Sequence, residues 1–167
     1  MNVEYFRTLF DYSYWARDRL LAVMQGMSEA EYGRSNGFTY GSIRGILTHC
    51  LDAEESWRCR FQGMPDTDVL PEALVPTPAA LAERWQAEEA HMRAFLAGLT
   101  DVDLTRAVVW RRPDGSERRV PSLWLSLAHV ANHSTQHRSE AAEALTLVGR
   151  SPGDLDLGLY AREVERR

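Results

Sequence analysis

The stretch PSLWLSLAHVANHSTQHRSEAAEALTLVG, residues 121–149, carries three of the chain's five histidines at a spacing of four residues. They are His129, His133 and His137. Side chains four residues apart lie on one face of an α-helix, so two neighbouring imidazoles of this set can hold one divalent ion. The outer two are too far apart to share an ion, because they are separated by roughly 12 Å along the helix axis. One ion therefore takes only an adjacent pair from this helix.

A third ligand has to come from another helix, and the sequence offers His49 and His91. His91 lies among Glu88 and Glu89 and is expected to face solvent. A lone histidine is more commonly a hydrogen-bonded residue than a metal ligand. Several imidazoles without partners in an apolar, alanine-rich helix would, however, cost desolvation energy. The triple spacing therefore favours metal binding, while it leaves open which adjacent pair takes part.

Size and composition predict one globular domain over residues 1–167, since 44% of the residues are hydrophobic and 26% are charged. The formal net charge of −5 argues against nucleic-acid binding, which requires a basic face to neutralise phosphates. The N-terminal stretch MNVEYFRTLFDYSYWARD has no apolar signal-peptide core, and no apolar run is long enough to span a membrane. These features predict a cytoplasmic protein with no membrane contact.

The two cysteines, Cys50 and Cys59, fall on one predicted helix. Their separation of about 13.5 Å along that helix exceeds the distance of about 7 Å that a disulfide can bridge. Neither has an identifiable base beside it, so both are expected to be small core residues in a reducing compartment.

Amphipathic spacing predicts four long helices. Asn2, Ser42 and Thr77 are suitable N-cap residues for the first three, and residues 28–31 form a capping-box signature for one short extra turn. The four long helices are expected over residues 3–25, 42–62, 77–98 and 121–149.

The connections complete an all-α four-helix bundle. Residues 63–78 carry four of the seven prolines and predict a long crossover loop, of the kind that forms a lid or links non-adjacent helices. A Pro-Asp-Gly turn at 113–115 predicts a small β-hairpin from residues 104–112 and 116–120. The tail after residue 150 predicts one short C-terminal helix. Bundles of this kind build metal sites from side chains on facing helices.

The string LAHVANHSTQHRSE in the fourth helix resembles the DinB-like family, whose pattern there is close to L-x-H-V-x-N-H-x-x-H-H-R-x-Q. Further blocks in the same order extend the resemblance over nearly the whole chain: FRTLFDYSYWARDRLL, YGSIRGILTHCLDAEESW, WQAEEAHMRAFLAGL and LVGRSPGDLDLGLYARE. The resemblance implies a bundle of DinB type.

The resemblance also implies a metal site of three histidines, carried over onto His49, His133 and His137. His129 then becomes a core or supporting histidine. The chain departs from the family pattern at two positions, where it has Gln136 and Glu140. Glu140 adds a negative charge one turn beyond His137, where it can alter substrate or metal preference.

Three neutral histidines leave coordination positions open, as in a catalytic rather than a structural site. They suit zinc or nickel best, and iron, manganese or cobalt less selectively. An ion held in this way lowers the pKa of a bound water or thiol.

The resemblance favours activation of a thiol over activation of water. It implies kinship with S-transferases and isomerases that use bacillithiol, mycothiol or glutathione. The first hypothesis is therefore a metal-dependent thiol S-transferase acting on a small-molecule electrophile, with Arg138 holding a carboxylate of thiol or substrate. The second is a metal-dependent hydrolase with Asp52 or Glu140 as base. The third is a non-catalytic, stress-induced metal-binding protein, in the form of a homodimer.

Overall fold

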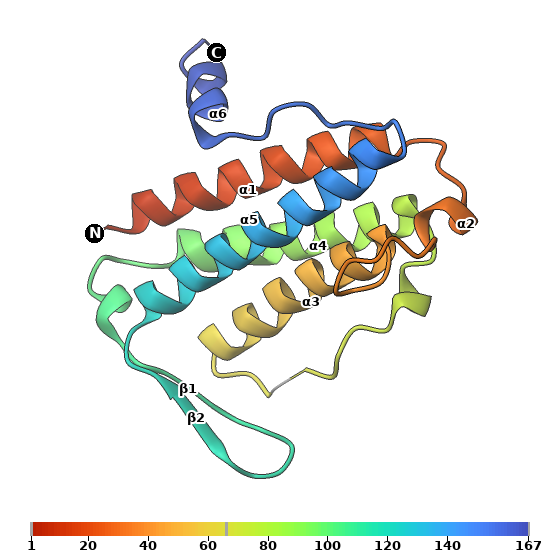
Figure 1. Cartoon of the computed structure of the whole chain (residues 1–167). Helices are drawn as coiled ribbons and strands as arrows, with labels where there is room; N and C mark the ends of the chain where they lie inside the picture. The colour runs from red at the N-terminus through yellow and green to blue at the C-terminus, as the bar shows by residue number, and fades with distance from the viewer. Residues whose placement is uncertain (1, 66, 167) are drawn as a thin grey trace.

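The computed structural model describes residues 2–65 and 67–166, and in it four long helices lie side by side (Figure 1). Positions 1, 66 and 167, at the ends of the predicted domain and within the crossover, lie outside the described residues. The all-α four-helix bundle predicted from the sequence is confirmed. Its helices are α1 (Val3–Val23), α3 (Ile43–Phe61), α4 (Pro78–Ala97) and α5 (Leu123–Leu147).

The remaining elements are short. They are α2 (Glu29–Tyr32), η1 (Glu72–Leu74), η2 (Asp103–Thr105), β1 (Val108–Arg111), β2 (Glu117–Val120) and α6 (Leu157–Val164).

The predicted helix caps are present. Side-chain oxygens of Asn2, Ser42 and Thr77 each accept a backbone N–H from the third residue beyond them. Ser28 heads the reciprocal capping box of α2. Such bonds satisfy N–H groups that the first helical turn leaves without a partner, so local sequence fixes where these helices begin.

The neighbours and directions of the four long helices depend on the connections between them. Helix α5 lies between α1 and α3, and α4 packs against the other side of both. Figure 1 shows that α1 and α5 run in one direction, whereas α3 and α4 run in the opposite direction. Because α3 and α4 are parallel neighbours, the chain between them has to return along the length of the bundle. The long loop therefore links adjacent helices, and the expectation that it joins non-adjacent helices is wrong.

Two side-chain contacts hold this crossover against α3. Asp52 Oδ1 accepts the backbone N–H of Leu70 at 2.8 Å. The hydroxyls of Ser56 and Thr67 form a hydrogen bond of 2.7 Å. The crossover is thus fastened to the helix that carries His49.

The predicted hairpin is confirmed, with shorter strands. Strands β1 and β2 pair antiparallel from Val108 opposite Val120 to Arg111 opposite Glu117. Gly115 in the turn has φ of 81°, a conformation that glycine adopts at low cost. Leu104 is not in a strand, because it lies in the η2 turn and is buried in the core.

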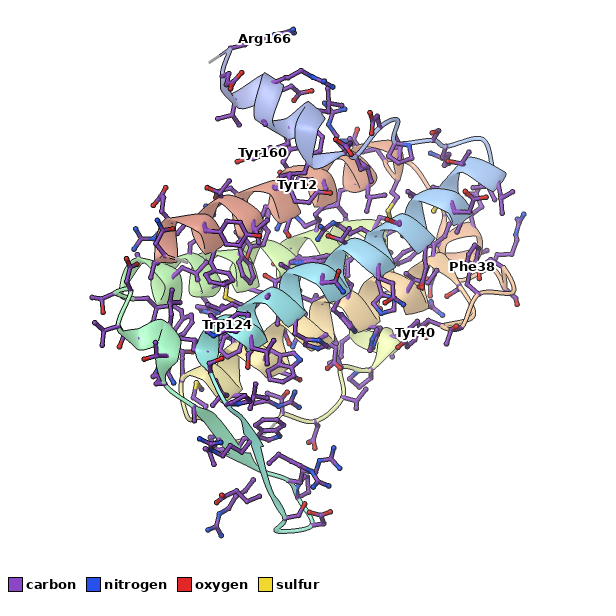
Figure 2. All side chains as sticks on the ribbon, turned by 60° about the vertical axis from the view of Figure 1, so that its left-hand side comes forward. Tyr12, Phe38, Tyr40, Trp124, Tyr160 and Arg166 are labelled. Atoms are coloured by element: carbon purple, nitrogen blue, oxygen red, sulfur yellow. The ribbon has the colours of Figure 1, made fainter. Side chains whose placement is uncertain are left out.

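The C-terminal helix α6 stands apart from the bundle and contacts α1 (Figure 1). Figure 2 shows Tyr160 beside Tyr12, and their ring centroids are 5.8 Å apart. Trp15 Nε1 donates to Glu163 at 2.9 Å. These aromatic and polar contacts confirm the predicted packing of the tail on the bundle.

The core divides into two apolar clusters along the bundle axis. The cluster near α2 and the crossover includes Leu20, Ile46, Leu47, Trp85 and Leu145. The cluster near the hairpin includes Phe6, Phe10, Met92, Leu127 and Val130.

Both cysteines are free and buried, as predicted. Burial raises the pKa of the Cys50 thiol to about 12, so this thiol stays protonated at neutral pH. Among the helices of the described residues, none is long and apolar enough to cross a membrane.

Charged groups are buried where α3 meets α1 and α4. Glu54 is 3% exposed, and its carboxyl group accepts hydrogen bonds from Tyr14 Oη at 2.6 Å and Trp85 Nε1 at 3.0 Å. Arg58 Nε donates to Glu88 at 2.6 Å. Burial raises the pKa of Glu54 to about 7, although the two hydrogen bonds act in the opposite direction.

This pKa makes stability depend on pH in a definite direction. The folded protein keeps the Glu54 proton to a higher pH than the unfolded chain, so its contribution is full below about pH 4.5 and is lost as pH rises through about 7. We expect the free energy of unfolding to fall by about 2 kcal/mol more in the wild type than in Glu54→Gln between about pH 5 and 8. Urea unfolding at both pH values measures the difference.

Glu83→Gln is the matched control, because Glu83 is exposed on α4. It should follow the wild type at both pH values. The same loss of stability in Glu54→Gln as in the wild type would contradict the assignment.

Candidate metal centre

Three histidines converge between α3 and α5. His49 comes from α3, and His133 and His137 come from successive turns of α5. One ligand nitrogen from each lies within 4.8 Å of the other two, and the three form a group that could hold a metal ion. The Nε2 atoms of His49 and His133 are 3.1 Å apart. Spacing within α5 supplies the pair, and the packing of α3 against α5 supplies the third member.

The donor set fits a divalent cation. Three imidazole nitrogens on two helices match the number and type of protein ligands in catalytic zinc sites, and they also suit nickel. Two facing Nε2 atoms at 3.1 Å repel each other through their lone pairs unless a proton or a cation lies between them. A cation held by both atoms removes this repulsion.

Burial and neighbouring charges favour the neutral form of His49 and His133. Burial lowers the pKa of His133 to about 4, and the neighbouring His137 and His49 act in the same direction. Burial, followed by the charge of His137, also lowers the pKa of His49. Both rings are therefore neutral at physiological pH, which is the form that binds a metal.

Glu140 orients one member of the cluster. Its Oε2 lies 2.8 Å from Nδ1 of His137. Burial alone would raise the pKa of Glu140, but hydrogen bonds from His137 and Gln136 lower it overall, so the carboxylate is ionised and can only accept. Nδ1 of His137 therefore carries the proton, and its Nε2 is left as the free donor to an ion. The predicted charge near the pocket thus lies directly against one of the histidines.

Tyr40, which the sequence did not single out, lies at the cluster. Its ring stacks on that of His49 with centroids 4.0 Å apart, and its hydroxyl is 2.8 Å from His49 Nε2. Figure 2 shows Tyr40 on the loop beside the start of α3. The one sequence signal for this residue is its place just before the Ser42 cap, on a loop that has to fold back over the new helix.

The other two histidines lie elsewhere. The His129 ring makes an edge contact with the Trp57 ring, and their centroids are 5.1 Å apart. Burial lowers the pKa of His129, with a smaller contribution from the charge of Arg60. Its ring is 5.6 Å from that of His133, on the hairpin side of the cluster. His91 is exposed on α4, as predicted.

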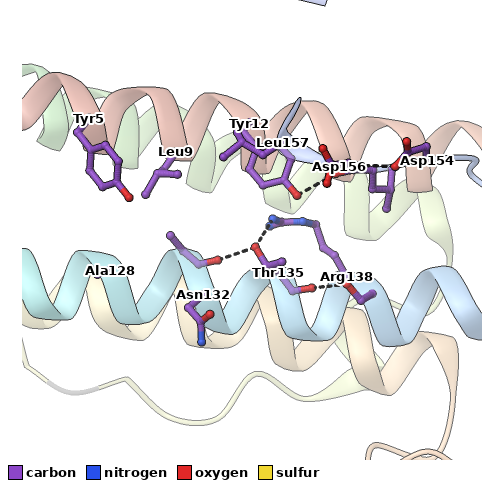
Figure 3. Close-up of a pocket in the computed structure, with 13 residues that line it drawn as sticks. Tyr5, Leu9, Tyr12, Ala128, Asn132, Thr135, Arg138, Asp154, Asp156 and Leu157 are labelled. Atoms are coloured by element: carbon purple, nitrogen blue, oxygen red, sulfur yellow. Dashed lines mark hydrogen bonds between the residues drawn. The ribbon is translucent and has the colours of Figure 1, made fainter. Parts of the chain in front are cut away.

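Two candidate catalytic residues make their hydrogen bonds outside the cluster. Asp52 uses one oxygen to hold Leu70 in the crossover. Arg138 lies on the flank of α5 that faces α1, where its guanidinium carbon is 5.5 Å from the centre of the Tyr12 ring (Figure 3). Neither makes a hydrogen bond to a histidine among the described residues.

Gly45 allows the loop with Tyr40 to lie on α3. A Cβ at this position would be 2.0 Å from the backbone oxygen of Tyr40, a distance that requires the backbone to move. The missing side chain is thus a condition for the stacking of Tyr40 on His49.

We expect Gly45→Ala to displace the loop and to lower stability by about 1–3 kcal/mol through overpacking. Gly98→Ala is the control, because a Cβ there would have its nearest contact at 3.6 Å. Thermal unfolding compares the two variants, and nuclear Overhauser contacts between Tyr40 and His49 report the stacking. Equal stability and unchanged contacts in both variants would contradict the role given to Gly45.

Comparison with known proteins identifies similar sequences over nearly the whole chain. The chain is 24% identical over 159 residues to Protein DinB of Bacillus subtilis (strain 168), and the match covers 91% of each chain. The family model described as DinB family matches residues 1–167. The chain therefore belongs to the DinB family.

Proposed function

We propose that the protein is a divalent-metal-dependent enzyme that transfers a low-molecular-weight thiol to an electrophile. The observation that carries the proposal is the convergence of nitrogens from His49, His133 and His137 within 4.8 Å of one another. Zinc and nickel are the ions that this set of neutral nitrogen donors suits best. When bound, the ion would lower the pKa of a thiol so that its sulfur is available as a nucleophile near neutral pH.

The reaction needs little else from the chain. The thiol gives up its proton to solvent water, a sulfur–carbon bond forms, and the leaving group departs with the electron pair of its own bond. Glu140 keeps the His137 ring in one tautomer through the 2.8 Å contact to Nδ1. The Tyr40 hydroxyl, at 2.8 Å from His49 Nε2, lies at the cluster and can donate to a substrate there.

The hydrolase alternative has less support. A hydrolase would need a carboxylate that is free to take a proton from water. Asp52 already accepts the N–H of Leu70, and Glu140 already accepts from His137. Because one oxygen of each carboxylate is occupied, both are weakened as general bases, and this disfavours the hydrolase relative to S-transfer.

Metal titration tests the ligand set. The wild type is expected to bind one zinc or nickel ion, and His49→Ala, His133→Ala and His137→Ala are each expected to lose that binding. Glu140→Gln should weaken it by about 10- to 100-fold, because His137 loses its orienting partner. Isothermal titration calorimetry of chelator-treated protein makes the measurement, with His91→Ala as the control that binds like the wild type.

His129→Ala separates the two possible pairs on α5. It should bind metal as the wild type does, since His129 lies against Trp57. Loss of the ion in His129→Ala together with normal binding in His49→Ala would overturn the proposed ligand set.

Thiol conjugation tests the reaction. Metal-loaded protein is expected to accelerate the conjugation of bacillithiol, mycothiol or glutathione to an activated haloarene. Chromatography of the conjugate measures the rate. Chelation and His49→Ala should each reduce the rate to that of the uncatalysed reaction, whereas the His91→Ala rate should equal that of the wild type. Turnover of an ester or amide without any thiol would instead indicate a hydrolase, and metal binding without turnover would indicate a non-catalytic protein.

A further inference from the structure

A cavity of about 640 Å³ lies on the flank of α5 that faces α1, and residues 154–157 close its third side (Figure 3). Volumes of this size are typical of small-molecule sites. His137 and Arg138 are successive residues, so their side chains leave α5 about 100° apart. Of the described residues that line the cavity, none belongs to the three-histidine cluster. The cavity is thus a separate place on the same helix.

Arg138 presents a buried positive charge to this cavity. The residue is 2% exposed and lines the cavity beside Tyr12. Its one hydrogen bond to a described residue runs from Nη2 to Thr135 Oγ1 at 3.2 Å, and no described carboxylate forms an ion pair with it. A guanidinium has five N–H donors, so most of them are not used by these neighbours. Because a buried cation without an anionic partner is costly, the cavity favours an anionic group next to Arg138.

Two carboxylates line the side of the cavity that residues 154–157 form. Asp154 Oδ1 accepts the N–H of Asp156 at 2.9 Å, and Asp156 Oδ1 accepts the N–H of Gly158 at 2.7 Å. The second oxygen of each accepts no hydrogen bond from a described residue. A simple anion bound at Arg138 would be repelled by these two charges, whereas a ligand that also carries an ammonium group is attracted at both ends.

We propose that this cavity binds a free α-amino acid with an apolar side chain. The ligand carboxylate pairs with Arg138, and the ammonium group pairs with Asp154 and Asp156. Leu9 and Tyr12 of α1 supply the apolar wall for the ligand side chain. This site is independent of the metal centre and of the proposed S-transfer.

Calorimetry with chosen ligands tests the site. We expect the wild type to bind L-leucine or L-phenylalanine. Isocaproate, which lacks the amino group of leucine, and isoamylamine, which lacks the carboxylate, should each bind about tenfold more weakly or worse. Isocaproate binding as tightly as leucine, or no binding of either amino acid, would overturn the proposal.

Variants assign the two ends of the ligand. Arg138→Met and Asp154→Asn should each weaken leucine binding by about tenfold or more, while Arg119→Met, an exposed change on β2, leaves it unaltered. Asp154 is exposed, so its variant keeps the fold even if Arg138→Met does not. Unchanged affinity in Asp154→Asn, or in a folded Arg138→Met, would contradict the assignment.

Two further measurements test whether this site is independent of the metal centre and whether Arg138 lacks an anionic partner. Chelation of the metal should leave leucine affinity unchanged, so this site can fail or succeed independently of the S-transfer proposal. Without ligand, Arg138→Met should be as stable as the wild type or more so, because it removes a buried charge that has no anionic partner.

Discussion

The close packing of α5 on α3 is the constraint on which the rest of the structure depends. Small buried side chains make this approach possible, among them Ser134 and Ala141 on α5 and Cys50 on α3. Helices approach most closely where the contacting side chains are short. An imidazole ring extends only a few ångströms from its backbone, so larger residues at these positions would separate His49 from the pair on α5. The composition of this interface therefore decides whether a metal centre can form at all.

The interior holds polar groups in three different electrostatic states. The ring of His133 is kept neutral by burial, and Glu54 keeps its proton to an unusually high pH for a carboxylic acid. Arg58 is a half-buried charge that has Glu88 as its partner at 2.6 Å. Arg138 belongs to neither group, because it is charged and has no partner carboxylate among the described residues. This contrast is what separates a structural ion pair from a cation directed toward a ligand.

The sequence was sufficient to predict features that depend on neighbouring residues or on helical periodicity. Helix starts follow from caps such as Ser42, and the pair on α5 follows from a spacing of four residues. The resemblance to the DinB-like family added His49, which period alone could not choose. The contact of Asp52 with Leu70 and the position of Arg138 beside Tyr12 could not be predicted, because they depend on how loops and neighbouring helices pack. Tyr40 was missed for the same reason, since it reaches the cluster only where Gly45 leaves room for the loop.

The late position of α5 in the chain has a consequence for biosynthesis. Helix α5 contributes to both apolar clusters, yet it is the last of the four bundle helices to be translated. A nascent chain that has emerged only as far as the hairpin therefore exposes apolar faces of α1 and α3 that nothing earlier in the polypeptide can cover. Contacts between residues far apart in the sequence slow folding and prolong the exposure of aggregation-prone apolar surface. The core therefore closes only after α5 has emerged, when both flanks of this helix gain their neighbours together.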